Sequence, residues 1–335
     1  MEYVALGRTG MRVSELCFGT MSFGDIATEE TSHAMYARCR DAGINFFDCA
    51  NVYSAGRAEE MLGRFIAAER DEVVITTKVG FPMGEGPNDQ GLSLRHIVSS
   101  VDASLRRLGT DRIEILFLHT YDPITPMEET LRALDRVVRQ GKVLHIGASN
   151  WAAWQMARAI GLSGRLDLPS FCCVQPMYSL VKRQAEVEIL PMAHGEGLGV
   201  ISYSPLGGGL LTGKYGTDRK PRTGRLVENH MYQTRYENPS YYEIADGLAR
   251  IAGEVGCHPA TLAVSWVKRN SALTAPIIGA RSVEQLEPSL AAAAFEMSQD
   301  LYEKISALSP TPPPATDRTE ERLGVSYRGS AERYK

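Results

Sequence analysis

The chain has 335 residues, a net charge of −4, and a composition that is 44% hydrophobic and 23% charged. This composition is typical of a globular protein, and the mildly acidic charge gives no electrostatic reason to expect nucleic acid or an anionic membrane as a partner. The first residues, MEYVALGRTGMRV, lack the apolar stretch of an export signal, and no run of about 18 apolar residues could span a bilayer.

The cysteines show neither paired spacing nor histidine neighbours that would suggest zinc, and most of them lie inside apolar segments. They are Cys17, Cys39, Cys49, Cys172, Cys173 and Cys257. We therefore expect a reduced, cytoplasmic protein without a metal site.

The chain opens with a predicted β-hairpin, because YVALGRTGMRV alternates around a Gly-Arg-Thr-Gly turn. Eight apolar, strand-like runs follow, at 15–19, 44–48, 73–78, 113–118, 143–147, 171–174, 198–202 and 273–278. Amphipathic stretches with helical spacing separate most of them, such as 29–42, 93–108, 127–140 and 179–195. Eight such units predict a (β/α)8 TIM barrel, with the hairpin closing its bottom. The alternative is a doubly wound sheet, but FGTMSFG after the first strand does not match the GxGxxG turn of that fold.

Two segments interrupt the alternation. Residues 213–241 are rich in Lys, Arg, Gly and Pro and predict a long loop, and loops of that length in a compact domain are usually functional or disordered. Residues 309–335 begin SPTPPPATDR and predict a poorly ordered tail, which leaves residues 1–308 for the barrel.

Four polar residues fall at the ends of predicted strands or just beyond them: Asp48 ends INFFD, Lys78 ends VVITTK, His119 ends IEILFLH, and Tyr53 follows Asp48 by five residues. In parallel α/β folds, chemistry collects at the carboxyl ends of strands. A carboxylate, a phenol, an ammonium and an imidazole at one barrel mouth suit the protonation of an oxygen that gains negative charge. A carbonyl oxygen does so when hydride arrives.

An ammonium about 4 Å from the Tyr53 phenol would stabilise the phenolate by up to ~4 kcal/mol at an effective dielectric of ~20. This attraction by itself would lower the pKa of Tyr53 by ~2–3 units, before desolvation acts against it. Asp48 would hold Lys78 charged, and His119 would direct the carbonyl oxygen or relay its proton. Taken singly, the four residues also have ordinary explanations as a rim tyrosine, a helix cap, a solvated lysine and a structural histidine. Their joint placement favours the catalytic interpretation.

Three segments resemble the aldo-keto reductase family. GINFFDCANVYSAGRAEEMLG at 43–63 is similar to its first signature, VVITTKVG at 73–80 to its lysine strand, and residues 116–150 to its histidine strand and the cofactor amide segment that follows. The likeness covers roughly residues 3–308 and places the family's catalytic tetrad on Asp48, Tyr53, Lys78 and His119. It implies a (β/α)8 barrel and NADPH-dependent reduction of an aldehyde or ketone to the alcohol without metal, with Tyr53 as general acid.

The resemblance also implies a cofactor site with NADP(H) across the barrel mouth. Its residues would be Thr20, Met21, Asp48, Ser149, Asn150, Gln175, Tyr203, Ser204, Pro205, Leu206, Gly207, Gly208, Lys214, Arg225, Gly279, Arg281, Gln285 and Ser289. Ser149, Asn150 and Gln175 would bind the nicotinamide carboxamide, and Tyr203 would stack on the ring. The alternatives are helix capping by Ser149 and Asn150, a buried amide at Gln175, and a core position for Tyr203.

Glycines in the segment SPLGGG would let backbone amides approach the pyrophosphate, and Lys214 and Arg225 would close over it. The turn IIGARSVEQLEPS resembles the family's adenosine-binding turn, where Arg281 would bind the 2′-phosphate of NADPH; the alternative is an ion pair with Glu284. The chain departs from the family at Pro288 and Ser289, where many relatives have Glu and Asn.

Two other functions are compatible with the sequence. Some proteins that resemble this chain are cofactor-sensing regulatory subunits of potassium channels, but they carry asparagine at the position of His119. A dehydrogenase that oxidises a sugar or cyclitol would use the same site in the opposite direction. The natural substrate and the oligomeric state are not predicted.

Overall fold

The computed structural model describes residues 1–319, and within them eight parallel strands close into a barrel in the order β10-β3-β4-β5-β6-β7-β8-β9. The strands are β3 (Cys17–Gly19), β4 (Phe46–Asp48), β5 (Val74–Val79), β6 (Ile113–Leu118), β7 (Val143–Ser149), β8 (Cys173–Gln175), β9 (Gly199–Ser202) and β10 (Ala275–Ile278). Each overlaps the run predicted for it, so the prediction of a (β/α)8 barrel is confirmed.

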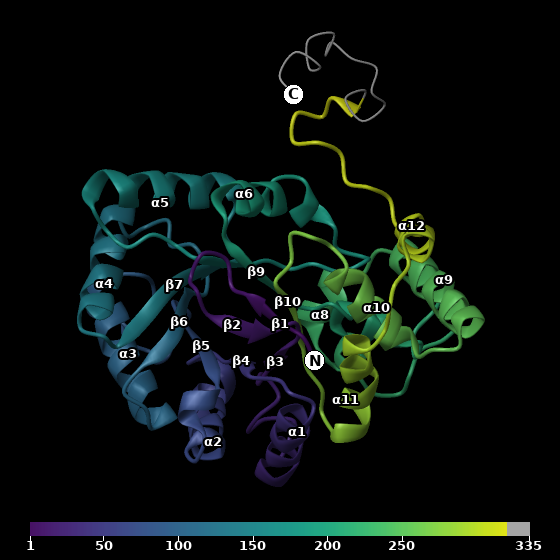
Figure 1. Cartoon of the computed structure of the whole chain (residues 1–335), viewed down its shortest axis with the longest axis horizontal. Coiled ribbons are helices and arrows are strands. Elements are labelled where there is room, and N and C mark those ends of the chain that lie inside the picture. The colour runs from purple at the N-terminus through teal and green to yellow at the C-terminus, as the bar shows by residue number, and fades with distance from the viewer. Residues whose placement is uncertain (320–335) are drawn as a thin grey trace.

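Helices surround the barrel (Figure 1). They are α1 (Glu29–Asp41), α2 (Arg57–Ile66), α3 (Leu94–Leu108), α4 (Met127–Arg139), α5 (Ala153–Leu166), α6 (Ile189–Glu196), α9 (Ser240–Val255), α10 (Pro259–Lys268), α11 (Val283–Leu290) and α12 (Gln299–Ser306). Helix α3 shows how the sequence sets such an element: the Ser93 hydroxyl caps its start by accepting from the His96 amide at 3.2 Å. Ile97 and Val101, one turn apart, are buried against the sheet, and Gly109 ends the helix in the left-handed region.

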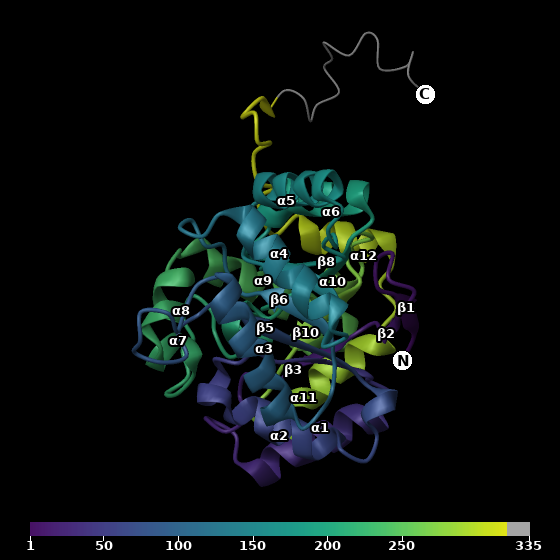
Figure 2. The same ribbon diagram turned by 90° about the vertical axis from the view of Figure 1, so that its left-hand side faces the viewer.

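The N-terminal hairpin closes the bottom of the barrel. It pairs β1 (Tyr3–Ala5) with β2 (Arg12–Ser14), and the Ser14 amide donates to Asn45 Oδ1 at 2.7 Å, just before β4 begins. The fully buried side chain of Leu6 lies in the same hydrophobic cluster as the barrel-interior residues Phe46 and Ile115. Figure 2 shows the hairpin on one side of the molecule and α7 (Arg225–Glu228) and α8 (His230–Arg235) on the opposite side. The carboxyl ends of the strands therefore face away from the hairpin.

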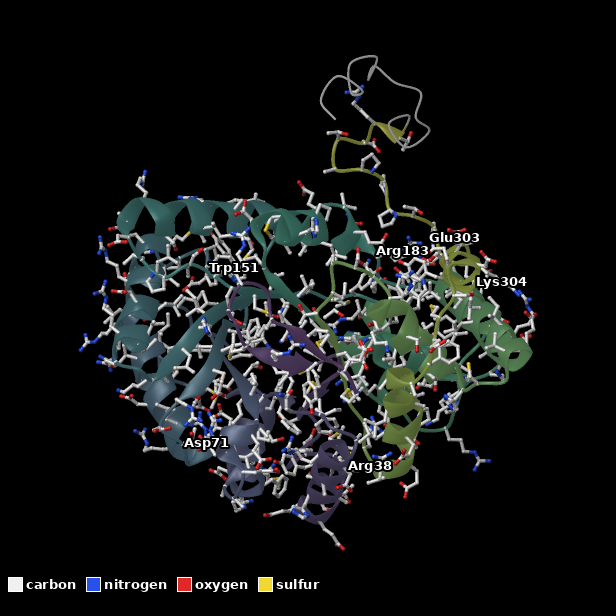
Figure 3. The ribbon with its side chains drawn as sticks, viewed as in Figure 1. Arg38, Asp71, Trp151, Arg183, Glu303 and Lys304 are labelled. Atoms are coloured by element: carbon white, nitrogen blue, oxygen red, sulfur yellow. The ribbon has the colours of Figure 1, made fainter. Side chains whose placement is uncertain are left out.

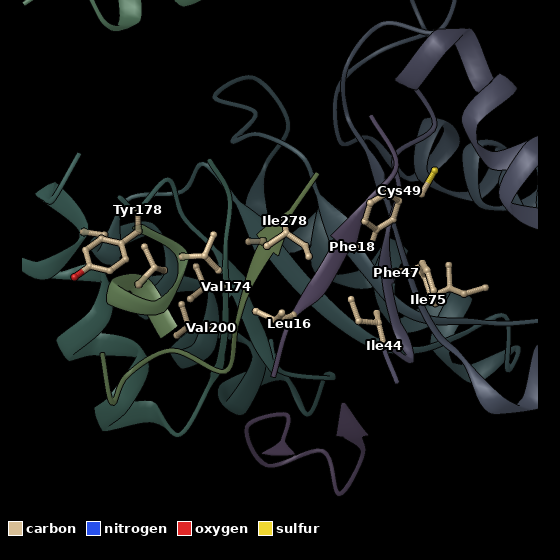
Figure 4. Packing of buried hydrophobic residues seen from close by; sticks show 14 of the residues in the cluster. Leu16, Phe18, Ile44, Phe47, Cys49, Ile75, Val174, Tyr178, Val200 and Ile278 are labelled. Carbon is tan, nitrogen blue, oxygen red and sulfur yellow. The ribbon is translucent and has the colours of Figure 1, made fainter. Parts of the chain in front are cut away.

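The main core lies between the sheet and its helices. Side chains of alternate residues in the strands, and of Leu16 just before β3, point outward into it; they include Phe18, Phe47, Ile75 and Val174 (Figure 4). Because the strands are buried on both faces, their sequences are apolar almost throughout.

The helix predicted over 179–195 is wrong in its first half. Ser179 and Lys182 form a tight antiparallel bridge, and α6 begins only at Ile189. Pro191 accounts for this limit, because proline has no amide hydrogen and its ring crowds the carbonyl four residues earlier in a longer helix. Arg183 lies in this non-helical part and pairs with Glu186 at 2.9 Å. It donates to the carbonyl oxygens of Ser306 and Ser309 beside α12, where Figure 3 labels it.

The segment 213–241 is not the plain loop that its composition predicts. It contains the short helices α7 and α8, and α9 already begins at Ser240. The Asn229 side chain caps α8 by accepting from the Tyr232 amide at 3.3 Å. The buried rings of Tyr232 and Tyr236 attach this segment to the barrel, which supplies the apolar contacts that short helices need.

The C-terminal tail is described only as far as residue 319, and residues 309–319 contain neither an α-helix nor a strand. The rest of the predicted tail, 320–335, lies outside the described residues. Within residues 1–319, no helix is both long and apolar enough to cross a bilayer.

Candidate active site

The structure brings the four predicted polar residues together at the carboxyl ends of neighbouring strands. Asp48 is the last residue of β4, Lys78 lies near the end of β5, and His119 directly follows β6. The parallel register sets Asp48 beside Thr76 of β5. Tyr53 begins a short 3-10 turn, Tyr53–Gly56, that leads from β4 into α2.

The Lys78 ammonium is the centre of this group. It is fully buried and donates hydrogen bonds to Asp48 Oδ2 at 2.6 Å, to the Cys49 carbonyl oxygen at 2.7 Å and to the Tyr53 hydroxyl at 3.3 Å. All three ammonium hydrogens therefore have an acceptor, which is what a buried cation requires. The phenol of Tyr53 is held within hydrogen-bond distance of a positive charge.

Asp48 is itself fixed by two further donors. Its Oδ1 accepts from Thr76 Oγ1 at 2.7 Å and from Gln175 Nε2 at 2.8 Å. Thr76 was missed by the sequence reasoning, although it lies two residues before Lys78 and period-2 alternation puts both on one face of the strand. Gln175 was predicted to bind a carboxamide, and in the structure its amide donates to the Asp48 carboxylate from across the barrel.

Burial outweighs the charge of Lys78 at the Tyr53 phenol. Desolvation raises the pKa of Tyr53 to about 12, although the ammonium acts in the opposite direction. The expected lowering of this pKa therefore describes only the electrostatic contribution, which desolvation exceeds. Burial alone would lower the pKa of Lys78, but Asp48 and Tyr53 together raise it above its ordinary value. At neutral pH the site therefore holds a protonated phenol beside an ammonium.

His119 is neutral at this site. Burial, and then the positive charge of Lys78, lower the pKa of His119 to about 2. Its Nδ1 has no hydrogen-bond partner among the described residues. The imidazole contacts two aromatic rings, Tyr53 with centroids 6.0 Å apart and Phe81 at 4.4 Å. Phe81 was not predicted, although an aromatic residue three positions after the strand-end Lys78 was a usable signal.

A second hydrogen-bond network crosses the barrel mouth next to the tetrad. Asn150 Nδ2 donates to the His119 carbonyl oxygen at 2.9 Å and to Ser149 Oγ at 3.1 Å. Asn150 Oδ1 accepts from the Tyr203 hydroxyl at 2.7 Å, and Ser149 Oγ donates to the Gln175 carbonyl oxygen at 3.0 Å. The four residues come from the ends of β7, β8 and β9, so one network orients the side chains predicted to hold a nicotinamide.

The segment 204–208 follows β9 and has an unusual backbone. Ser204, Gly207 and Gly208 have φ angles of 60°, 57° and 68°. A Cβ atom at Gly208 would lie 2.8 Å from the Tyr232 ring, so only glycine fits against that ring. Pro205 and Leu206 lie between these positions, and Leu206 precedes the short 3-10 helix Gly207–Thr212.

The loop after β3 joins this rim. Both the amide and the hydroxyl of Thr20 donate to the Asp48 carbonyl oxygen, at 2.9 Å and 3.1 Å. Met21 beside it is 37% exposed, so its side chain remains accessible at the rim.

Lys214 and Arg225 occupy different surroundings. Lys214 lines a groove of about 680 Å³, with Asp246 and His258 among its other walls. The guanidinium of Arg225 lies 5.5 Å from the centroid of the Tyr232 ring, and that ring packs against Gly208. Of the two, Arg225 has the contact that links it to the barrel mouth.

The predicted cofactor residues after β10 differ in their exposure to solvent. Gly279 and Gln285 are exposed, and Arg281 lies just before Ser282, whose hydroxyl caps α11 by accepting from the Gln285 amide. Ser289 is fully buried, with a hydroxyl that has no partner among residues 1–319, so it is covered by protein in this structure. Those same residues contain no group of three or more His, Cys, Asp or Glu side chains arranged to hold a metal ion.

Comparisons with known proteins agree with this architecture. The model of the aldo/keto reductase family matches residues 15–310. An uncharacterized oxidoreductase of Bacillus subtilis, YrpG, is 39% identical over 93% of this chain and 97% of its own length. A probable voltage-gated potassium channel subunit beta of Oryza sativa is 38% identical over 95% of this chain and 99% of its own, and one of Arabidopsis thaliana is 39% identical over 87% and 91%. With a family match that spans the whole barrel, the chain belongs to the aldo/keto reductase family.

Proposed function

We propose that this protein is an oxidoreductase that reduces an aldehyde or ketone to the alcohol with NADPH. The observation that carries the proposal is the buried Lys78 ammonium, which contacts Asp48 at 2.6 Å and the Tyr53 hydroxyl at 3.3 Å. A buried cation beside a phenol has a clear use when the phenol must release a proton, because the phenolate then forms next to a positive charge.

Tyr53 is the proton donor in this proposal. With a pKa of about 12, its phenol is fully protonated at neutral pH and ready to donate. As the carbonyl oxygen gains negative charge, the proton passes from the Tyr53 hydroxyl to that oxygen. Lys78 stabilises the resulting phenolate, by ~1 kcal/mol in a water-like dielectric and up to ~4 kcal/mol at an effective dielectric of ~20. Asp48 keeps Lys78 charged and in place.

His119 orients the substrate in this scheme. Because its pKa is about 2, a neutral imidazole is present at every working pH. A neutral ring can donate one hydrogen bond to the carbonyl oxygen and so direct that oxygen toward Tyr53. The low pKa means that His119 does not act as a stable imidazolium acid.

The residues present fit a nicotinamide dinucleotide. The cofactor supplies the hydride when bound. The side chains of Ser149, Asn150 and Tyr203 meet in one hydrogen-bond network at the barrel mouth, and their hydroxyl and amide groups suit a carboxamide group there. In (β/α)8 barrels, phosphate groups often bind at the loops after the last two strands and at the start of a short helix there. Here those loops carry Gly207, Gly208 and Arg281.

Arg281 supports NADPH over NADH. A guanidinium can bind a phosphate through two charge-assisted hydrogen bonds, which contribute about 1.5–3 kcal/mol. NADH lacks that phosphate, so a preference of roughly 10–150-fold for NADPH corresponds to this interaction when nothing opposes it.

The test is an absorbance screen of NADPH consumption with aldehydes, ketones, sugars and quinones. The proposal predicts turnover with at least one carbonyl class, and turnover that depends on Tyr53. If NADPH binds but no class of carbonyl is reduced and no alcohol is oxidised by NADP⁺, the enzymatic proposal fails. Activity only with sugars or cyclitols and NADP⁺ would assign the oxidative direction instead.

A second candidate is a regulatory subunit of a potassium channel. It is favoured by the similarity to the probable voltage-gated potassium channel subunits beta of Oryza sativa and Arabidopsis thaliana. His119 argues against it, because the resemblance associates such subunits with asparagine at that position. The two candidates differ in steady-state rate: with excess NADPH and carbonyl substrate, an enzyme exchanges its cofactor and turns over many times, whereas a sensor that exchanges cofactor slowly stalls after about one turnover.

A further inference from the structure

Glu228 lies opposite the proposed phosphate-binding arginine. Its Oε2 is 4.0 Å from an Nη nitrogen of Arg281, and the side chains are 52% and 29% exposed. Glu228 ends α7 in the segment after β9, whereas Arg281 follows β10. The pair therefore joins the two loops that would flank the adenosine end of the cofactor.

The position of Glu228 is fixed by its own segment. Its Oε2 accepts a hydrogen bond from the Gly224 amide at 3.0 Å. Gly224 has a φ angle of 148° and packs so closely on the Tyr215 hydroxyl that a Cβ atom would collide with it. Tyr215 is buried, so this turn is anchored to the protein, and the carboxylate faces Arg281 without needing support from it.

Both members of the pair keep free hydrogen-bonding capacity. A separation of 4.0 Å is too long for a direct hydrogen bond, so the guanidinium N–H groups of Arg281 are not used by Glu228. Among residues 1–319, Glu228 Oε1 accepts no hydrogen bond. The guanidinium N–H groups of Arg281 and the Oε1 atom of Glu228 thus remain available to a ligand, close together on one surface.

These two groups favour different ligands. A guanidinium favours a ribose 2′-phosphate, whereas a carboxylate accepts a hydrogen bond from a free 2′-hydroxyl and repels a phosphate. We propose that Glu228 is a specificity-determining residue that opposes Arg281, weakening NADPH binding and strengthening NADH binding so that both cofactors are used. This inference rests on the proposed nicotinamide-dependent function and adds a residue that sets its cofactor selectivity.

The test is the ratio of the dissociation constants for NADH and NADPH, measured by fluorescence quenching in the wild type and in Glu228→Gln. Glutamine keeps an oxygen acceptor for the Gly224 amide, so the turn is preserved. Removing one negative charge near the phosphate should tighten NADPH binding about five- to tenfold, from Coulomb energies at ~7 Å in a water-like dielectric. NADH binding should weaken by about two- to fivefold, as expected for loss of one charged acceptor.

Two further variants test whether the change in cofactor selectivity is specific to the Glu228–Arg281 pair or follows from removing any charge in this region. Arg281→Ala should shift the ratio in the opposite direction by weakening NADPH binding. Glu237→Gln removes an exposed carboxylate from the same segment and should leave the ratio unchanged within about twofold. Adenosine 2′,5′-bisphosphate and 5′-AMP, which lack nicotinamide, should repeat the shifts seen with the two dinucleotides.

The outcomes distinguish the two proposals. If the wild type binds neither dinucleotide, the proposed function fails. If both bind and Glu228→Gln leaves their ratio within twofold of the wild type, or changes both affinities equally, the function stands and Glu228 is only a cap of α7. A ratio that shifts toward NADPH by about tenfold or more, together with the opposite shift in Arg281→Ala, supports the inference.

Discussion

The Lys78 ammonium lies 2.6 Å from Asp48 Oδ2, and both side chains are almost completely shielded from water, at 0% and 4% exposure. Two charges buried this deeply depend on each other. The attraction between them offsets a desolvation cost of several kcal/mol per ion. Hydrogen bonds from Thr76 and Gln175 to the other carboxylate oxygen of Asp48 also stabilise its charge.

Asp48→Ala should destabilise the fold strongly, because it leaves the Lys78 ammonium buried without an opposite charge. We expect the free energy of unfolding, measured with urea, to fall by about 3–5 kcal/mol. Asp111→Ala is the control: it removes an 85% exposed partner of Arg112 and should cost under ~1 kcal/mol. Equal losses of unfolding free energy in the two variants would show that an unpaired Lys78 ammonium in the interior costs no more than a broken ion pair at the surface.

His119 should make the fold sensitive to mild acid. Its pKa is about 2 in the folded protein and ~6.5 in an unfolded chain, so below pH ~6.5 the unfolded state binds a proton that the folded state rejects. The free energy of unfolding therefore falls with decreasing pH from ~6.5 toward ~2. Between pH ~6.5 and ~5 the loss attributable to His119 amounts to about 2 kcal/mol.

Urea unfolding of His119→Asn at the same two pH values measures this contribution. The variant should lose about 2 kcal/mol less than the wild type on acidification. His194→Asn, at an exposed position on α6, should retain the full wild-type loss. Identical acid sensitivity in His119→Asn and the wild type would mean that His119 is not forced to stay neutral.

Tyr203→Phe should weaken cofactor binding and leave the chemical step intact. The change removes the 2.7 Å hydrogen bond to Asn150 but keeps the ring. One lost hydrogen bond of about 1 kcal/mol corresponds to a roughly fivefold higher dissociation constant for NADPH. Tyr3→Phe, which removes a hydroxyl at the hairpin end, is the control and should bind like the wild type. A tenfold loss of turnover at saturating cofactor would assign Tyr203 to catalysis instead.

NADPH should protect the segment 216–224 from trypsin. Lys220 and Arg222 are exposed there, between the barrel and α7, and the proposed cofactor would contact both flanks of the segment. Cleavage at Arg222 should slow several-fold at saturating NADPH. The same rate with and without cofactor would show that the segment does not close over the bound dinucleotide.

The sequence allowed the barrel to be predicted because each strand is buried on both faces and its apolar run is nearly continuous. Asp48, Lys78 and His119 could be placed together for the same reason, since strand ends in a parallel barrel share one rim. Their electrostatics could not be predicted. The attraction of Lys78 for the Tyr53 phenolate was foreseeable, but the desolvation that exceeds it depends on how completely the phenol is covered.

Contacts between side chains on opposite sides of the barrel mouth could not be predicted from the sequence either. Gln175 bonds to Asp48 over 127 positions, and Tyr203 bonds to Asn150 over 53, through side-chain orientations that no local pattern determines. The approach of Glu228 to Arg281 depends on α7, which spans only Arg225–Glu228. A helix that short has no periodicity to detect, and its position follows from packing.

The most direct test of the proposed function is the turnover of Tyr53→Phe with the best carbonyl substrate, at saturating NADPH. The change deletes the proton donor and leaves the ring and the Lys78–Asp48 pair in place. We predict a loss of at least ~100-fold in turnover, the lower end of what a positioned general acid contributes, with the NADPH dissociation constant within about twofold of the wild type. Turnover within about threefold of the wild type would contradict the assignment of Tyr53 as the acid and, with it, the catalytic role of the buried lysine.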